Sequence, residues 1–161
     1  MIDISKNAED NSSYELSAED FNEFKTKIGG EFPPKSVLLI RTGWSKYWPD
    51  AEKYLGHKTD TSKLRFPGLS LDAATLIALN KNVVGVGIDT ASMDFGESTE
   101  FLVHRMLQRH GKYILENVAS LNYLVGKSSF KLTVSPMKIQ GGTGSPCRIF
   151  ASVDISAKDE F

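Results

Sequence analysis

The hydrophobic positions of the chain change their spacing several times, and each change predicts a different element. Residues 37–40 and 83–88 are continuous apolar runs rich in Val and Ile, which is typical of strands buried on both faces. Between them, residues 71–79 place apolar side chains at helical spacing after Ser70, whose hydroxyl can cap a first turn. A strand, a helix and a strand in this order predict a parallel α/β unit.

Weaker patterns predict the other elements. Ser17 is expected to cap a helix whose apolar face holds Phe21, Phe24 and Ile28. Ser98 or Thr99 is expected to cap a helix over roughly 100–110. The remaining expectations are strands near 2–4, 113–116, 130–134 and 148–155, short helices within 45–54 and 118–124, and loops over 6–16 and 56–69.

Composition narrows the class of protein. The 161 residues hold 19 Lys+Arg against 20 Asp+Glu, a formal net charge of -1, which speaks against a partner that is a nucleic acid. No apolar run is long enough to span a membrane, and the start of the chain does not resemble a signal peptide. We therefore expect a cytoplasmic protein with one domain over residues 1–161. The single cysteine, Cys147, excludes an intramolecular disulfide and is expected to be buried and inert.

Polar side chains gather where the run 83–88 ends. Asp89, Thr90, Ser92 and Asp94 follow this strand closely, and ligands of open α/β sheets bind at the carboxyl ends of strands. These four residues are therefore candidates for a substrate pocket. The alternative is a capped turn, in which the same short side chains bond the local backbone.

Two further residues could bind a metal ion or act in catalysis. His104 lies within an apolar helical pattern, where a histidine is more often part of the core, and Glu116 interrupts an apolar run. A buried carboxylate must be paired, hydrogen-bonded, protonated or metal-bound, so His104 and Glu116 could converge on one cation. Two ligands are fewer than most metal sites use. Without a metal, the expected partner of Glu116 is one of three cations, namely Arg41, Arg105 or Arg148.

Five segments in order resemble the cyclase family, the metal-dependent hydrolases that include kynurenine formamidase and isatin hydrolase. They are Arg-Thr-Gly-Trp at 41–44, Phe-Pro-Gly-Leu-Ser at 66–70, Gly-Ile-Asp-Thr-Ala-Ser-Met-Asp at 87–94, the span from His104 to Glu116, and residues 136–148. The resemblance implies a swivelling α/β domain with a mixed sheet and flanking helices. It also implies hydrolysis of amide bonds in small, often tryptophan-derived molecules, with one or two divalent metal ions, zinc or manganese.

By this resemblance, His104 and Glu116 match metal ligands of the family, with His104 the candidate catalytic residue. Asp89, Thr90 and Ser92 match a strand-end motif near the active site. The family's main metal motif, His-x-Gly-Thr-His-x-Asp-x-Pro, has no counterpart here, because residues 1–5 align with an interior strand of the family. The metal site of this chain is therefore expected to be incomplete.

Three hypotheses follow, and they leave open whether the chain is an enzyme. It is the C-terminal portion of an amide hydrolase that is active only with the absent segment, or a non-catalytic module that binds a small amide. Alternatively, it is a structural or assembly subunit. A homo-oligomer or another partner would then cover the apolar surface that the absent segment leaves.

Overall fold

The structure is a computed structural model that describes residues 1–127 and 129–153. These residues belong to two compact units, Met1–Val125 and Gly126–Phe161. The first unit contains a parallel sheet with helices, and the second contains an antiparallel hairpin. The α/β class expected from the sequence is confirmed, with parallel and antiparallel pairings in separate sheets. That residues 1–161 act as one domain stays a prediction.

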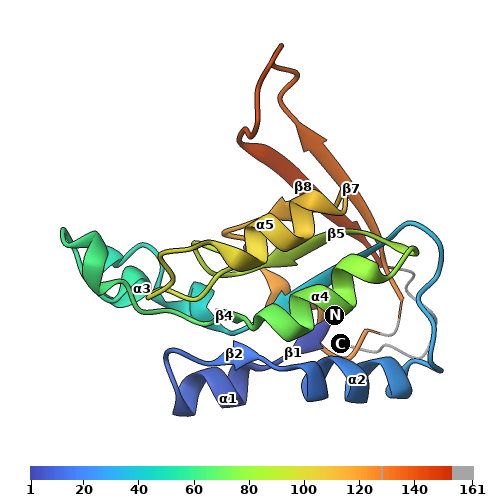
Figure 1. The fold of residues 1–161 in the computed structure, drawn as a ribbon, viewed down its shortest axis with the longest axis horizontal. Coiled ribbons are helices and arrows are strands. Elements are labelled where there is room, and N and C mark those ends of the chain that lie inside the picture. The colour runs from blue at the N-terminus through green and yellow to red at the C-terminus, as the bar shows by residue number, and fades with distance from the viewer. Residues whose placement is uncertain (128, 154–161) are drawn as a thin grey trace. The chain divides into compact units, whose positions relative to one another are not determined.

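The first unit is organised by a four-stranded sheet in which every pairing is parallel. The strand order is β1-β3-β5-β6, formed by β1 (Ile2–Asp3), β3 (Ser36–Arg41), β5 (Val83–Ile88) and β6 (Tyr113–Leu115). A short parallel pair joins β2 (Glu15–Leu16) to β4 (Gly68–Leu69). Because the four strands run in one direction, their carboxyl ends lie along one edge of the sheet (Figure 1).

Helices of different lengths connect these strands. The longer ones are α1 (Ser5–Asp10), α2 (Ala18–Lys27), α4 (Leu71–Leu79) and α5 (Leu102–Arg109). The short ones are α3 (Ala51–Leu55) and the 3-10 turns η1 (Trp44–Tyr47), η2 (Thr61–Lys63) and η3 (Leu121–Leu124). The predicted caps of α2 and α4 are confirmed. Ser17 forms a capping box with Asp20, and the Ser70 side chain accepts from the Ala73 amide.

Several local predictions were wrong. Residues 56–69 are not a continuous loop, because η2 and β4 form there. Residues 6–16 are not a continuous loop, because α1 and β2 form there. Helix α1 has six residues and no side-chain cap, so its own sequence stabilises it weakly. Its formation therefore depends on tertiary contacts, such as the burial of Ala8. Helix α5 begins at Leu102 rather than after Ser98 or Thr99, since a carboxylate from another loop caps it.

The core of the first unit lies between the sheet and its helices. Helix α4 contributes small side chains, such as Ala73 and Ala74, together with Ile77, all fully buried in the same cluster as Leu38 and Val86. Small residues let a helix approach the strands closely. Burying one large aliphatic side chain stabilises the fold by about 1.5–3 kcal/mol. Contacts of this kind fix the sheet, and the sheet fixes where the strand ends lie.

The second unit is described from Gly126 to residue 153, apart from residue 128. Its strands β7 (Lys131–Pro136) and β8 (Cys147–Ser152) pair antiparallel, with Val134 opposite Ile149. The predicted strand 148–155 is therefore found as far as Ser152, and residues 154 and 155 lie outside the described part. Cys147 is exposed, so its predicted burial was wrong. It is the first residue of a strand with a single neighbour, where little can cover it.

Across residues 1–127 and 129–153, every helix is too short or too polar to cross a bilayer.

We predict that Ile77→Ala lowers the free energy of unfolding by about 2–5 kcal/mol, because it leaves a cavity in the core. Leu79→Ala on the same helix is the matched control. Leu79 is 62% exposed, and its truncation should change stability by less than about 0.5 kcal/mol. Urea denaturation followed by circular dichroism measures both. Equal losses in the two variants would contradict this description of the core.

Candidate functional site

A buried carboxylate, Asp94, determines where α5 begins. Asp94 lies in the segment after β5 and is only 2% exposed. Its Oδ1 accepts a hydrogen bond from the Val103 amide at 2.9 Å, and its Oδ2 accepts one from the His104 amide at 3.1 Å. A carboxylate at this end of a helix satisfies free N–H groups and complements the helix dipole. Asp94 thereby sets the position of every side chain on the first turn of α5.

His104 lies between two carboxylates. Its Nδ1 is 2.6 Å from Asp94 Oδ2, and its Nε2 is 3.1 Å from Glu116 Oε1. Glu116 follows the last residue of β6, and its Oε1 also accepts from the Met93 amide at 3.0 Å. We call Asp94, His104 and Glu116 the carboxylate–histidine cluster. The pair that the sequence singled out, His104 and Glu116, is thus brought together by α5 and the end of β6.

The charges of the cluster hold a proton on His104. Hydrogen bonds to Asp94 and then Glu116 raise the pKa of His104 from its ordinary value of 6.5 to about 9, against the opposing effect of burial. Burial pushes the pKa of Asp94 upward. Hydrogen bonds from the His104 ring and two backbone amides outweigh that effect, so the pKa of Asp94 is lowered. At neutral pH the imidazole is therefore a cation between two acidic side chains.

The prediction that Glu116 pairs with Arg41, Arg105 or Arg148 was wrong. Glu116 instead contacts the His104 ring and accepts a hydrogen bond from the Met93 amide. Arg41 pairs with Asp3 at 2.8 Å. The ring of His57 also has a role that the sequence did not suggest, because its Nδ1 accepts from the backbone amide of Asp60.

The four strand-end candidates separate into different environments. Asp94 joins the carboxylate–histidine cluster, as described above. Asp89 is buried, and its two oxygens accept three hydrogen bonds from Thr42 and Gly43 at 2.7–2.9 Å. Thr90 is also buried and donates to the carbonyl of Ser92 at 2.9 Å. Ser92 Oγ is buried and lacks a hydrogen-bond partner within the described ranges.

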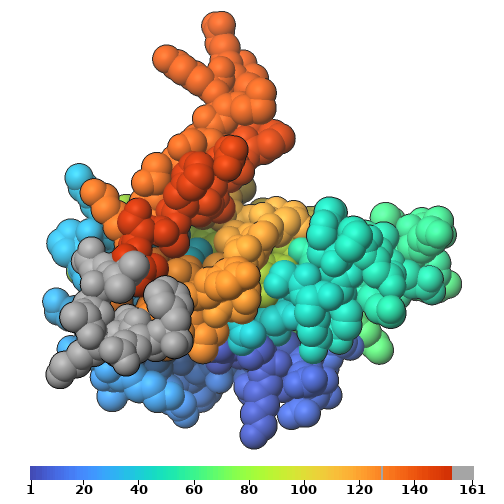
Figure 2. Space-filling view, turned by 180° about the vertical axis from the view of Figure 1, so that it is seen from behind, coloured from blue at the N-terminus to red at the C-terminus, as the bar shows by residue number. Residues whose placement is uncertain are grey.

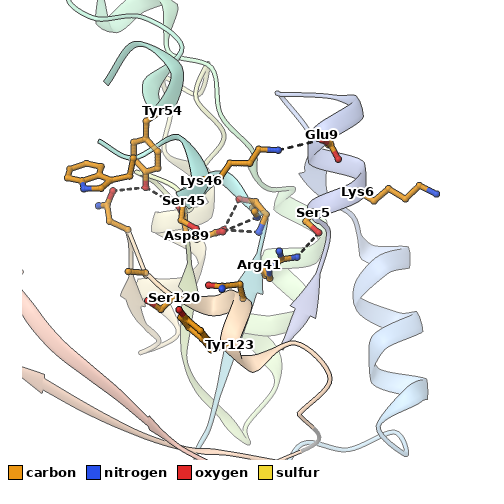
Figure 3. A pocket seen from close by; sticks show the side chains of 16 residues that line it. Ser5, Lys6, Glu9, Arg41, Ser45, Lys46, Tyr54, Asp89, Ser120 and Tyr123 are labelled. Atoms are coloured by element: carbon orange, nitrogen blue, oxygen red, sulfur yellow. Dashed lines mark hydrogen bonds and ion pairs between the residues drawn. The ribbon is translucent and has the colours of Figure 1, made fainter. Parts of the chain in front are cut away.

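A pocket of about 780 Å³ lies at the carboxyl ends of the parallel strands. We call it the strand-end pocket. Asp89 lines it, together with Arg41 at the end of β3 and Asn117 after β6, whereas the members of the carboxylate–histidine cluster do not (Figure 3). Of the four predicted pocket residues, Asp89 is therefore the one that lines this pocket.

Tyr54 also lines this pocket, and no sequence pattern pointed to it. The Tyr54 hydroxyl lies 3.0 Å from the Asp89 carbonyl oxygen and 2.9 Å from Asn117 Oδ1. Burial, followed by the charges of Asp89 and Glu116, raises the pKa of Tyr54 to about 12, so its hydroxyl stays neutral. Asn117 directly follows Glu116 and has a φ of 55°, a left-handed conformation that asparagine tolerates.

The carboxylate–histidine cluster fits part of a divalent metal site. Imidazole nitrogen and carboxylate oxygen are donors that zinc and manganese accept, and His104 Nε2 and Glu116 Oε1 lie close together. Asp94 on Nδ1 is the outer carboxylate that commonly orients a metal-binding histidine. Within residues 1–127 and 129–153, however, no group of three or more His, Cys, Asp or Glu side chains is placed to hold a metal ion. The described residues thus supply two ligands of a site that needs more.

A parallel sheet with helices and polar clusters at its strand ends defines an α/β protein with a strand-end site. A family model described as "Putative cyclase" matches residues 1–95, which is more than half of the chain. The chain belongs to this cyclase family, as the ordered motifs predict.

The chain is similar in sequence to hydrolases of known name, and similar in structure to a hydrolase whose structure has been solved. Isatin hydrolase of Roseibium aggregatum is 30% identical over 157 residues, which cover 95% of this chain and 58% of that protein. Kynurenine formamidase of Polaromonas naphthalenivorans is 38% identical over 76 residues, covering 47% and 33%. The structure of isatin hydrolase A from Labrenzia aggregata, bound to benzyl benzoate, matches with a TM-score of 0.84 and 32% identity, covering 94% and 59%. The chain thus spans less than two thirds of the length of these relatives.

We predict that the His104 ion pairs make stability depend on pH. A histidine whose pKa is raised on folding stabilises the protein fully below about pH 6.5, and this contribution is lost as the pH rises through about 9. The free energy of unfolding should therefore fall between these values, and it should fall less in His104→Gln. Urea denaturation at both pH values measures the difference. His110→Gln, which removes an exposed histidine, is the control and should behave like the unmodified chain. An identical fall in all three proteins would contradict the assignment.

Proposed function

We propose that this chain carries part of the active site of a metal-dependent amide hydrolase that acts on small, tryptophan-derived amides. His104 and Glu116 are two of its metal ligands. The observation that carries the proposal is the fixed approach of His104 Nε2 to Glu116 Oε1, with Nδ1 held by buried Asp94. The names of the similar proteins, isatin hydrolase and kynurenine formamidase, support the reaction class and the kind of substrate.

A bound zinc or manganese ion would polarise the amide carbonyl and lower the pKa of a water molecule. The residues of this chain would prepare that site. Asp94 holds the Nδ1 side of the ring and leaves Nε2 directed at Glu116. The Met93 amide holds Oε1 of Glu116 in place. Because a metal ligand must be deprotonated, His104 would have to release the proton on Nε2 in order to hold a metal ion.

We further propose that the chain by itself does not catalyse the reaction. Catalytic zinc sites commonly use three protein ligands, and the described residues supply two. The remaining ligands would come from outside the described residues, for instance from an associated polypeptide. Large exposed apolar side chains in the first unit, such as Phe101 at 52% and Leu79 at 62%, favour such an association.

A specific observation supports a second candidate function, the binding of a small molecule without catalysis. The strand-end pocket is large enough for a small organic ligand, and none of its lining residues belongs to the carboxylate–histidine cluster.

The metal proposal is tested by titrating the chain with manganese or zinc in a calorimeter. We expect weak binding or none, because two protein ligands are too few to hold a divalent metal ion tightly. His57→Ala serves as the control for adventitious binding to a partly exposed imidazole. Tight one-to-one binding that His104→Ala abolishes and His57→Ala preserves would contradict the proposal that the site is incomplete.

The reaction is tested by complementation. We expect the chain alone to leave isatin and N-formylkynurenine unhydrolysed with manganese or zinc present. Co-expression with the segment of isatin hydrolase that has no counterpart here should restore hydrolysis, and His104→Ala should abolish it. Hydrolysis by the chain alone, lost in His104→Ala, would show that the site is complete. Hydrolysis unaffected by His104→Ala would remove this residue from the mechanism.

Association is tested by sedimentation velocity. At a concentration of tens of micromolar, we expect a dimer or a larger species, since large exposed apolar side chains favour burial against a partner. A stable monomer would exclude a second copy of the chain as the source of the missing ligands.

A further inference from the structure

The strand-end pocket is built mainly from three segments that lie far apart in the sequence. They are helix α1, the end of β3 with the turn that follows it, and the segment 117–123 after β6; Tyr54 and Asp89 also line the pocket. Figure 2 shows these segments meeting on one face of the first unit, in dark blue, teal and orange. The pocket has a volume of about 780 Å³, which is ample for a small organic molecule.

The acidic groups of the pocket already have partners. Both oxygens of Asp89 accept hydrogen bonds from Thr42 and Gly43. Glu9, on α1, forms an ion pair with Lys46 at 3.6 Å. The lining therefore offers few free carboxylate oxygens to a ligand that carries donors or a positive charge.

The donors of Arg41 are only partly used. Its Nη1 contacts both oxygens of Asp3 at 2.8–3.0 Å and donates to Ser5 Oγ at 2.7 Å. Its Nε and Nη2 groups have no hydrogen-bond partner in the described part of the chain, although a guanidinium carries five N–H donors. These atoms reach solvent, because Ser92 Oγ is the one fully buried side-chain nitrogen or oxygen without a partner within the described ranges. The Arg41 side chain is nevertheless only 21% exposed.

Hydroxyl groups add further donors around this guanidinium. Ser5 Oγ accepts from Arg41, and the Ser5 side chain also hydrogen-bonds the Asp3 carboxylate, so Ser5 is not among the free donors. Ser45 and Ser120 also line the pocket, and neither hydroxyl has a partner within the described ranges. In Figure 3, Arg41 lies between Ser5 and Tyr123, among the labelled residues of the pocket. A partly buried guanidinium surrounded by free hydrogen-bond donors is suited to bind an oxyanion. A planar carboxylate matches the two parallel N–H groups of the guanidinium best.

Aromatic side chains complete the lining. Trp48 is 67% exposed, and its ring packs edge-on against Tyr54 with centroids 5.5 Å apart. Tyr123 is 76% exposed. Large aromatic surfaces left open beside a polar pocket favour contact with a ring of a ligand.

We propose that the strand-end pocket binds a small aromatic carboxylate, with the carboxylate on the free edge of Arg41 and the ring against Trp48 and Tyr123. A guanidinium can hold two carboxylates on different edges, so the pairing with Asp3 is kept. The members of the carboxylate–histidine cluster do not line this pocket. The site therefore does not rest on the proposed metal-dependent reaction, and either can fail without the other.

The probe is phenylacetate, and tryptophan fluorescence of the full 161-residue chain reports its binding, because Trp48 lines the pocket. We expect saturable quenching by phenylacetate. Phenylacetamide has the same shape without the charge and should bind at least tenfold more weakly. Inorganic phosphate, an anion without a ring, should also bind at least tenfold more weakly than phenylacetate.

Variants locate the site. Arg41→Gln should weaken phenylacetate binding at least tenfold, and Arg109→Gln, which removes an exposed arginine on α5, should leave it unchanged. Because Arg41→Gln also removes an ion pair, circular dichroism must show that it is folded. Tyr123→Leu changes an exposed residue and tests the site independently of that ion pair, with an expected weakening of threefold or more.

The proposal is overturned if phenylacetate does not bind, or if phenylacetamide or phosphate binds equally well. It is also overturned if Tyr123→Leu and a folded Arg41→Gln both bind like the unmodified chain. If Arg41→Gln does not fold, Tyr123→Leu and the phenylacetamide comparison decide the question.

Discussion

The buried carboxylate of Asp94 is the group on which the arrangement of the site depends. It caps α5 through two backbone amides and binds the ring of His104 through Nδ1. One side chain therefore fixes the start of the helix and the direction of the imidazole. Glu116, directly after β6, is held by the Met93 amide, so both groups that face each other are held by the segment after β5: His104 by the Asp94 side chain and Glu116 by the Met93 backbone. Such double anchoring is how proteins hold reactive groups within a fraction of an ångström.

The parallel sheet brings two polar sites to one edge. Strands β3, β5 and β6 end beside one another, so the residues that follow them become neighbours in space although they are far apart in the chain. After β5, the Asp89 side chain accepts hydrogen bonds from the segment after β3, whereas the Asp94 side chain accepts them from the first residues of α5. Within the strand-end pocket, the Tyr54 hydroxyl hydrogen-bonds the Asp89 carbonyl and Asn117 Oδ1, and Asn117 directly follows Glu116 of the cluster. The two sites are thus adjacent without sharing the residues that give them their charge.

Much of the fold could be predicted from local patterns, but the charge pairs could not. The run 83–88 and the cap at Ser70 depend on nearby residues, and both were predicted correctly. Helix α5 was placed too early because its cap, Asp94, lies eight positions before its first residue and belongs to the preceding loop. Arg41 was a candidate partner for Glu116, yet the parallel pairing of β1 with β3 places Asp3 beside it. Choosing between such partners requires the register of the sheet.

The sequence by itself determined the α/β class, the principal strands and helices, the cyclase family and the pairing of His104 with Glu116 as a candidate site. Repeating patterns and ordered motifs carry that information, because they reflect backbone hydrogen bonding and burial over short stretches. The tertiary structure alone decided that Asp94 completes the cluster, that Asp89 turns to a separate pocket and that Arg41 keeps donors free within it. These outcomes depend on the distance and direction between side chains on different elements, which strand order and helix packing set.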